Sequence, residues 1–339
     1  MSRTTGGPPP KKRATLRTIS ELTGLSQSTI SLSLRGGTAL KEETRKRIAE
    51  VAASVGYVPD RAGVRLRTGK TNVLALVLDG AEGSIDFARN MIQGIGQAIQ
   101  GTRYHMNVSP EFAHSHSVNT VRYILENRTA DGIILTHTSA RDPRVQLLMD
   151  NDFPFVTHGR TEFFSPHPYH DFHAEQFIRQ SVERLAGQGC KSVMLIIGGD
   201  QTNNYHTIVT NFERAAARLK LESQIIGSAD DNPIELRKLG RELARSKNRP
   251  DGIISDSEMR SICLISGLND EGVRVPEDMQ FISKQTSTVL PAFFPAVDTV
   301  EEDIFSAGVE LTKLLLRRIA GEPAAALQSL AEPKTNWKS

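Results

Sequence analysis

The chain has little cysteine and no long apolar run. Its only cysteines, Cys190 and Cys263, are too few for a disulfide framework or a zinc site. No apolar stretch approaches the roughly 20 residues that a helix needs to cross a bilayer. Residues 1–10 lack the apolar core of a signal peptide. We therefore expect a cytoplasmic protein that binds no metal and spans no membrane.

The sequence also lacks the glycine and serine motifs of common α/β enzymes. No Gly-x-Gly-x-x-Gly follows a predicted strand, and neither a phosphate-binding loop nor a Gly-x-Ser-x-Gly elbow is present. These absences argue against catalysis and against a bound cofactor. A cytoplasmic α/β enzyme is the alternative, and a turnover assay would decide it.

Charge is distributed unevenly along the 339 residues. Residues 1–70 contain 14 Lys and Arg against five Asp and Glu, a net charge of +9. The remainder contains 27 against 34, a net charge of −7, so the overall +2 hides a basic head on an acidic body. Such asymmetry indicates a polyanionic partner for the head.

The head has the pattern of a helix–turn–helix. Ile19 and Leu22 are three residues apart, which predicts that both lie on the inner face of a first helix. Gly24 can end this helix in the left-handed conformation, because it has no Cβ. Ser26 can then cap a second helix by accepting from its free N–H groups.

The second helix has an apolar inner face and a polar outer face. Ile30 and Leu34, four apart, supply the inner face. Small polar side chains near a helix N-terminus are typical of a recognition helix in the major groove. The outer face carries Gln27, Ser28, Ser31, Leu32 and Arg35. A third helix is predicted at about 42–55, with Ile48, Val51, Ala52 and Val55 facing inward.

Together with residues 56–66, Gly-Tyr-Val-Pro-Asp-Arg-Ala-Gly-Val-Arg-Leu, this head resembles the LacI family of bacterial transcription regulators. Residues 57–60 look like the family's Tyr-x-Pro-Asn motif, and the residues after them look like its hinge helix. The resemblance implies that this helix enters the minor groove and that Leu66 wedges between base pairs. The similarity continues, at a lower level, through the rest of the chain.

Two positions depart from the family pattern. Leu32 stands where many members have Arg, so one guanine reader is absent. A leucine there suits a thymine methyl, or it packs within the head as an alternative. Gly63 stands where Ala is usual, and glycine costs roughly 1 kcal/mol in a helix interior. We therefore expect the hinge helix to fold only on DNA.

Pattern and resemblance together predict the DNA contacts and the division of the chain. The segments are a disordered arm (1–12), a helix–turn–helix domain (13–59), a hinge helix and linker (60–70), and an effector-binding and dimerisation domain (71–339). The expected DNA-binding residues are Thr15, Leu16, Ser26, Gln27, Ser28, Thr29, Ser31, Leu32, Arg35, Tyr57, Arg61, Gly63 and Leu66.

The body alternates short apolar runs with amphipathic segments. Residues 73–78 are continuously apolar, which is typical of a parallel strand buried on both faces, and a helical pattern from 87 to 99 follows. Further strands are predicted at 133–135, 153–157, 193–198, 252–255 and 279–282, with a helix near 209–219. This alternation implies βαβ units.

The resemblance divides this α/β body into two lobes, like those of periplasmic sugar-binding proteins. Lobe 1 would contain about 71–169 and 300–320. Lobe 2 would contain about 170–297 and 321–339. The tail after Leu330 lacks a leucine heptad, so we expect a homodimer.

Ligands bind such sheets at the carboxyl ends of their strands. The loops there present Phe87, His137, Asp171 and Asn204. By resemblance, Arg160, His206, Glu258 and Gln285 fall where family members contact effector. These polar groups and an aromatic face suit a polyhydroxylated ligand.

Less specific interpretations exist for some of these residues. Arg160 could form a surface salt bridge, and Glu258 could be an acid favoured at a helix N-terminus. The histidines His167, His170 and His173 could form a metal cluster, but the stretch contains prolines and no matching Cys or acid. One or two of them could instead bind effector.

The sequence thus predicts a repressor that binds a palindromic operator as a dimer and is released by a carbohydrate. An effector that is not a sugar, or is a phosphorylated one, is an alternative. A phosphate would favour a denser cationic cluster than Arg160 and Lys284 provide. A transport sugar-binding protein is disfavoured by the head and by the missing export signal.

Overall fold

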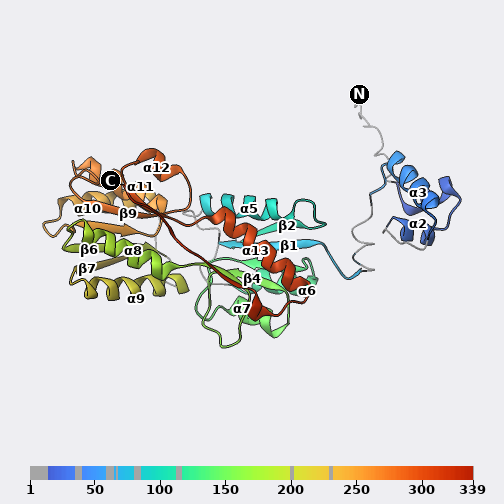
Figure 1. Ribbon diagram of the computed structural model, residues 1–339, viewed down its shortest axis with the longest axis horizontal. Helices are drawn as coiled ribbons and strands as arrows, with labels where there is room; N and C mark the ends of the chain where they lie inside the picture. The colour runs from blue at the N-terminus through green and yellow to red at the C-terminus, as the bar shows by residue number, and fades with distance from the viewer. Residues whose placement is uncertain are drawn as a thin grey trace, which may run out of the picture. The chain divides into compact units, whose positions relative to one another are not determined.

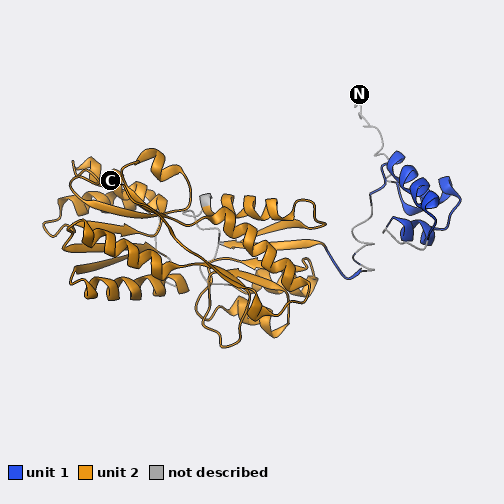
Figure 2. Cartoon of the chain, viewed as in Figure 1, with its two compact units in different colours: residues 1–71 blue, residues 72–339 orange. Residues whose placement is uncertain are grey.

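The computed structural model describes residues 14–34, 40–58, 65, 68–79, 85–111, 117–198, 202–228 and 232–338. They belong to two compact units, residues 1–71 and 72–339 (Figure 2). The division falls one residue after the expected end of the linker. None of the helices in the described ranges is long and apolar enough to cross a membrane.

Within residues 14–58, as far as they are described, the first unit has three helices around a small core. They are α1 (Leu16–Thr23), α2 (Gln27–Ser33) and α3 (Glu42–Ser54). Gly24 ends α1 at a φ of 73°, and Ser26 caps α2 by accepting from the Thr29 backbone N–H, as the sequence predicts. The core residues are Ile19, Ile30, Ile48 and Ala52, against which Leu34, Val51 and Val55 pack.

The prediction that Leu22 faces the core is wrong. Its side chain is 57% exposed, whereas Thr23 is buried and donates its hydroxyl to the Ile19 carbonyl. At about 100° per residue, position 23 lies about 40° from Ile19 around the helix, and position 22 about 60° away on the other side. The centre of the core lies toward Thr23, so Leu22 turns to solvent.

The hinge helix is largely outside the described residues. Arg65 and Thr68 have helical backbone, and the Gly69 N–H donates to the Arg65 carbonyl at 2.8 Å. Four residues of the expected DNA contacts lie outside the described ranges: Arg35, Arg61, Gly63 and Leu66.

Lobe 1 of the second unit is built on a six-stranded parallel sheet with the order β11-β5-β4-β3-β1-β2 (Figure 1). Its helices α5 and α13 cover one face and α6 and α7 the other. The strands are β1 (Val73–Asp79), β2 (His105–Glu111), β3 (Gly132–Leu135), β4 (Phe155–His158), β5 (Tyr169–Phe172) and β11 (Gln328–Ala331). The helices are α5 (Ile85–Ile99), α6 (Asn119–Asn127), α7 (Pro143–Asp150) and α13 (Ile304–Ile319).

Lobe 2 has a second six-stranded sheet, β12-β10-β9-β8-β6-β7, in which only β12 is antiparallel to its neighbour. Helices α8 and α9 cover one face, and α10 and α11 cover the other. The strands are β6 (Ser192–Gly198), β7 (Glu222–Ser228), β8 (Gly252–Ser255), β9 (Gln280–Gln285), β10 (Asp298–Glu301) and β12 (Lys334–Asn336). The helices are α8 (Ala174–Gly187), α9 (Asn203–Arg218), α10 (Pro233–Arg245), α11 (Glu258–Asp270) and α12 (Val289–Phe293). A 3-10 turn at Ala324–Ala326 lies between α13 and β11 and belongs to lobe 1.

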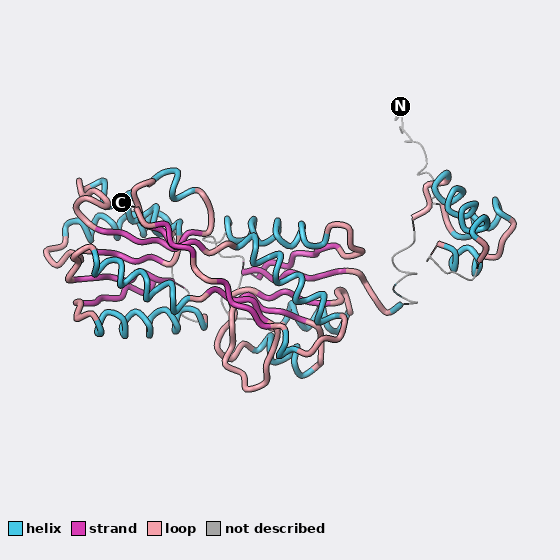
Figure 3. The backbone as a smooth tube through the Cα atoms, in the orientation of Figure 1, coloured by secondary structure: helices cyan, strands magenta, loops and turns pink. Residues whose placement is uncertain are grey.

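The chain crosses between the two sheets three times, after β5, after β10 and after β11 (Figure 3). Two expected lobe boundaries therefore shift. All of β5 belongs to lobe 1, and all of β10 belongs to lobe 2. The tail is shared between the lobes, because β11 pairs with β5 and only β12 pairs with β10.

Helices α5 and α13 pack backbone against backbone. A Cβ added at Gly94 would collide with the carbonyl oxygen of Phe305, and one added at Gly308 would meet the carbonyl of Met91. Gly96, two residues along α5, has open space around the position of its Cβ. The close approach, rather than helix propensity, therefore explains glycine at position 94.

We predict that Gly94→Ala destabilises the core by about 1–3 kcal/mol, because overpacking forces the two helices apart. Gly96→Ala is the matched control, and it should leave stability unchanged or raise it by up to about 1 kcal/mol, since alanine is the better helix former. Thermal unfolding of the two variants provides the comparison. Equal melting temperatures would show that α5 and α13 can separate without penalty.

Candidate DNA-binding surface and effector cavity

Helix α2 presents a small polar surface. The Ser26 hydroxyl lies 2.8 Å from the hydroxyls of both Ser28 and Thr29, which fixes the first turn of the helix. Gln27 and Ser28 are exposed, and Leu32 is 37% exposed and outside the core of the first unit. Surface exposure favours a contact made by Leu32 over packing within the head.

The other described residues of the expected DNA-binding set lie at the edges of this unit. Thr15 caps α1 and is exposed, and Ser31 is half-buried on α2. Leu16 and Tyr57 are half-buried and pack against the core, so each can offer only part of its side chain to DNA.

A cavity of about 130 Å³ lies between the carboxyl ends of the two sheets. Both lobes contribute to it, lobe 1 through the loops after β3 and β4 and lobe 2 through the start of α9 and the end of β9. Five of the eight expected effector residues line it: Phe87, His137, Arg160, Asp171 and Asn204.

The other three expected effector residues do not line this cavity. His206 is exposed on α9, with its ring 5.6 Å from that of Tyr205. Glu258, the first residue of α11, is buried and accepts from the Thr286 hydroxyl at 3.1 Å. Gln285 accepts from the Thr299 hydroxyl at 2.7 Å and donates to the Ser287 carbonyl.

Lys284, which the sequence places after a predicted strand, forms an ion pair in the cavity wall with buried Glu302, which the sequence analysis did not single out. The Lys284 ammonium lies 2.9 Å from one oxygen of Glu302, and His158 Nε2 lies 3.4 Å from the other. Lys284 also lies 5.9 Å from the centre of the Phe172 ring. Glu302 directly follows β10, so recognising that polar strand in the sequence would have pointed to it.

The charges lining the cavity are paired. Arg160 Nε donates to Asp171 at 2.7 Å, and the Phe172 backbone N–H donates to the other Asp171 oxygen. Burial raises the pKa of Asp171, and Arg160 offsets part of that rise. Burial alone would lower the pKa of Lys284 and raise the pKa of Glu302. Several opposite charges together outweigh burial: Glu302, Asp256 and Asp171 raise the pKa of Lys284, and Lys284 and His158 lower the pKa of Glu302.

Direct hydrogen bonds join the lobes around the cavity. The Asn203 backbone N–H donates to the Thr138 carbonyl at 3.1 Å, and its side chain donates to the Arg160 carbonyl at 3.2 Å. The Asn90 side chain of α5 donates to the Thr286 carbonyl at 2.8 Å. These contacts close the lobes over the cavity.

Two of the three histidines of the 167–173 stretch bond to protein groups, whereas the buried Nδ1 of His173 has no hydrogen-bond partner. His167 contacts the Thr161 hydroxyl and the Pro168 carbonyl, and His170 Nδ1 lies 2.8 Å from the Ser329 hydroxyl. Within the described ranges, no three His, Cys, Asp or Glu side chains are grouped to hold a metal ion. Burial, followed by repulsion from His158, lowers the pKa of His170 to about 4, although Glu302 opposes this shift.

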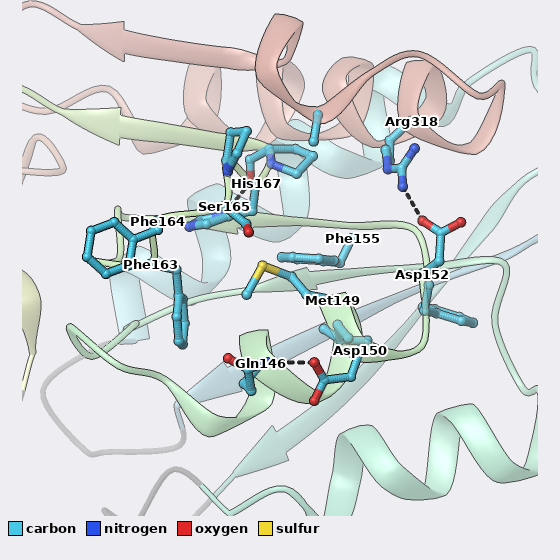
Figure 4. Close-up of a pocket in the computed structure, with 15 residues that line it drawn as sticks. Gln146, Met149, Asp150, Asp152, Phe155, Phe163, Phe164, Ser165, His167 and Arg318 are labelled. Carbon is cyan, nitrogen blue, oxygen red and sulfur yellow. Dashed lines mark hydrogen bonds and ion pairs between the residues drawn. The ribbon is translucent and has the colours of Figure 1, made fainter.

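A larger hollow, of about 510 Å³, lies on lobe 1 away from the strand ends that form the cleft (Figure 4). Met149 and Phe155 lie at its centre, and Phe163 and Phe164 lie on one side. Its charged groups are at the rim, where Arg318 pairs with Asp152 at 2.6 Å. Of the residues considered for effector binding, only His167, one of the alternatives, lines this hollow, and none of the eight expected effector residues does, so size alone does not identify the effector site.

A three-helix head on a two-lobed α/β core defines a class of DNA-binding regulators whose core is related to periplasmic binding proteins. Residues 15–60 match the family model for bacterial regulatory proteins of the lacI family. Residues 182–338 match the model for a periplasmic binding protein-like domain. The chain belongs to the LacI family and is a DNA-binding transcription regulator.

Relatives support this assignment along nearly the whole chain. The HTH-type transcriptional regulator AglR of Rhizobium meliloti is 26% identical over 320 residues, which cover 91% of this chain and 88% of AglR. CelR of Thermobifida fusca is 24% identical over 329 residues, covering 95% and 96%.

Two solved structures share the fold. A complex of the regulator CelR with cellobiose has a TM-score of 0.69 at 22% identity, and a lac repressor dimer bound to operator and the anti-inducer ONPF has a TM-score of 0.82 at 15% identity. Each comparison covers 96% of this chain and 98% of the other. The similarity therefore includes the head as well as the core.

The neutral state of His170 makes stability depend on pH. Its pKa is about 4 in the folded chain and about 6.5 when unfolded, so its contribution is complete above pH 6.5 and disappears as the pH falls toward 4. The shift corresponds to a loss on the order of 3 kcal/mol across that window.

We predict that His170→Gln, which carries no titrating group, reduces the fall in melting temperature between pH 7 and pH 5. The exposed His206→Gln is the matched control, and it should follow the wild type. Calorimetric melting at several pH values in this window measures both. The same pH dependence in wild type and His170→Gln would contradict a buried neutral His170.

Proposed function

We propose that the protein is a repressor that a neutral carbohydrate releases from its operator. The pairing of Arg160 with Asp171 and of Lys284 with Glu302 in one interlobe cavity carries this proposal. Both cationic side chains in the wall already have carboxylate partners, so an anionic ligand would find no uncompensated cation. A sugar hydroxyl, in contrast, can donate to a carboxylate and accept from its partner cation.

Aromatic rings in the wall fit the same class of ligand. Phe87 contacts His137 and His158 edge-on, with ring centres 5.3 Å apart in both pairs. Together with Phe172 it supplies apolar surface for the C–H face of a sugar ring. This combination of paired charges and aromatic rings favours a sugar over a phosphorylated effector.

The size of the cavity favours a small ligand. Its 130 Å³ is below the roughly 300 Å³ at which pockets for small molecules usually begin. We expect a ligand of about one sugar ring to fit the closed lobes, and a larger one to require wider separation. Relatives include a ribose operon repressor of Lactococcus lactis, 22% identical over 306 residues, as well as the CelR that was solved with cellobiose.

In the proposed mechanism, binding of the sugar and binding of the operator DNA oppose each other. In the cytoplasm, two heads of a homodimer read a palindromic operator, with Gln27, Ser28 and Leu32 facing base edges and Leu66 wedged into the minor groove. Sugar bound in the cleft favours one arrangement of the lobes, and the operator favours another. Each ligand then weakens the other by the same factor.

We predict that the first unit carries the operator affinity. The isolated core, residues 72–339, should lose operator binding, and binding by the full chain should fall steeply with salt as counterions return to the phosphates. Fluorescence anisotropy with operator and with unrelated DNA at several salt concentrations measures both effects. A core that binds operator as tightly as the full chain would refute this assignment.

We predict that Arg160→Gln weakens sugar binding by about 2–3 kcal/mol, or roughly 30- to 150-fold, because Asp171 loses its charged partner in a closed cleft. Operator binding should persist at sugar concentrations that release the wild type. His206→Ala, on the exposed side of α9, is the matched control and should respond like the wild type.

The sugar itself is identified first, from a panel of mono- and disaccharides that raise the melting temperature of the full chain. Calorimetry then gives the affinity of each variant, and a gel shift gives the release from operator. Unchanged affinity in Arg160→Gln would place the sugar outside this cavity. A full loss in His206→Ala would place it at the exposed side of α9.

A further inference from the structure

The loop between β3 and α7 brings a strained residue to the effector cavity. His137 has a φ of 53°, in the left-handed region that residues with a Cβ rarely adopt. Such backbone persists only where surrounding contacts hold it. The strained position lies in the cavity wall, where the His137 ring meets the edge of Phe87.

Arg144, in the first turn of α7, supplies those contacts. Its side chain is 3% exposed, and Nη2 donates to the carbonyls of Thr136 and His137 at 3.2 and 3.1 Å. These carbonyls belong to the peptides at the strained position. One guanidinium therefore binds both peptide groups that flank the left-handed residue.

Two buried carboxylates fix the guanidinium in turn. Asp142 accepts from Nε at 3.0 Å and from Nη2 at 2.7 Å, and Glu111 accepts from Nη1 at 2.7 Å. Burial alone would lower the pKa of Arg144, but these two acids outweigh it and the pKa is raised. The side chain thus stays charged and oriented, with donors on three nitrogens in use.

We propose that Arg144, which does not line the cavity, is the positioning residue of the effector site. This inference rests on the proposed function. Arg144 holds His137 in the wall through the His137 carbonyl. It thereby also fixes the position of the next residue, Thr138, whose carbonyl accepts from the Asn203 N–H across the cleft. A single buried side chain therefore controls one part of the ligand's surroundings and one of the contacts that close the lobes.

The chemistry of this position distinguishes arginine from lysine. A lysine keeps the positive charge beside Asp142 and Glu111, but its compact ammonium cannot reach two carbonyls and two carboxylates as a planar fork. Arg144→Lys should therefore still compensate most of the charge of Asp142 and Glu111, but lose the hydrogen bonds to the loop carbonyls of Thr136 and His137. Arg144→Met would leave both acids unpaired and is expected to fold poorly, so it is not the informative variant.

The test compares Arg144→Lys with Leu148→Ala in the full chain. Leu148 is buried on α7 in an apolar cluster of lobe 1 and makes none of the polar contacts that Arg144 makes with the loop, so its truncation destabilises lobe 1 while the hold on His137 stays in place. Hydrogen exchange at the amides of residues 136–142 is measured without ligand. Calorimetry with the sugar that stabilises the wild type, and operator binding, are measured well below the melting temperatures.

We expect at least tenfold faster exchange in the loop and at least tenfold weaker sugar binding for Arg144→Lys, with operator affinity unchanged. Leu148→Ala should lower the melting temperature and keep the sugar affinity. If the amides of residues 136–142 exchange as slowly in Arg144→Lys as in the wild type, the proposal is overturned, even if no sugar in the panel binds. A released loop with undiminished sugar affinity would overturn it as well, whereas a wild type that binds no sugar would refute only the proposed effector class.

Discussion

The cleft depends on the contacts of one carboxylate, that of Glu302, with Lys284 and His158. This carboxylate lies on the second crossing segment, buried, with Lys284 of lobe 2 on one oxygen and His158 of lobe 1 near the other. Transfer of such charges from water costs several kcal/mol per ion, and close pairing only compensates for that cost. Such a cluster adds little net stability, but it strongly disfavours any lobe arrangement that leaves one of its charges buried without a partner. We interpret it as a constraint on how the lobes meet.

The strand β1 gives the core a short path from the linker to the cavity. It begins at Val73, immediately after the first unit, and its partner strands β2 and β3 pair with it along most of its length. Beyond its carboxyl end, α5 carries Phe87 into the cavity wall and Asn90 to the lobe 2 loop. These contacts connect lobe 2, through α5, to a buried strand whose other end joins the linker. This arrangement provides one physical route for the coupling that we propose between sugar and operator.

Much of this fold could be predicted from the sequence because its central strands are buried on both faces. Strands β1, β3, β6 and β8 are mostly continuous apolar runs, β9 has an apolar centre at Phe281 and Ile282, and the sequence predicts each of the five within a few residues. The missed strands are of two kinds. Strands β2 and β7 lie at the sheet edges and carry polar residues, and β5, β10, β11 and β12 are three or four residues long and lie next to the crossing segments. Short polar strands give no periodic signal, so their existence depends on pairing that only the fold reveals.

The candidate site was predicted unevenly for a related reason. The rule that ligands meet the carboxyl ends of strands led to Phe87, His137, Asp171 and Asn204, all of which line the cavity. Of the four positions taken from the family resemblance, Arg160 alone lines it. His206 on α9 and Gln285 on β9 have neighbours that line the cavity but point elsewhere themselves, because a helix turns about 100° per residue and a strand alternates its faces. Glu258 begins α11, and none of the cavity-lining residues belongs to that helix. Neither approach could find Arg144, whose role depends on acceptors brought together from β2, the β3–α7 loop and its own helix.

The closed lobes set a limit on how an effector can act. Three direct hydrogen bonds, from Asn203 and Asn90, join the lobes. At about 1 kcal/mol net for each bond, they favour closure by at most a few kcal/mol, an amount that a second ligand can overcome. A sugar shifts this equilibrium only by the difference between its affinities for the closed and open lobes, however tightly it binds to both. The paired charges supply such a difference, because Asp171 and Lys284 lie on opposite lobes and surround one ligand only while the lobes are together.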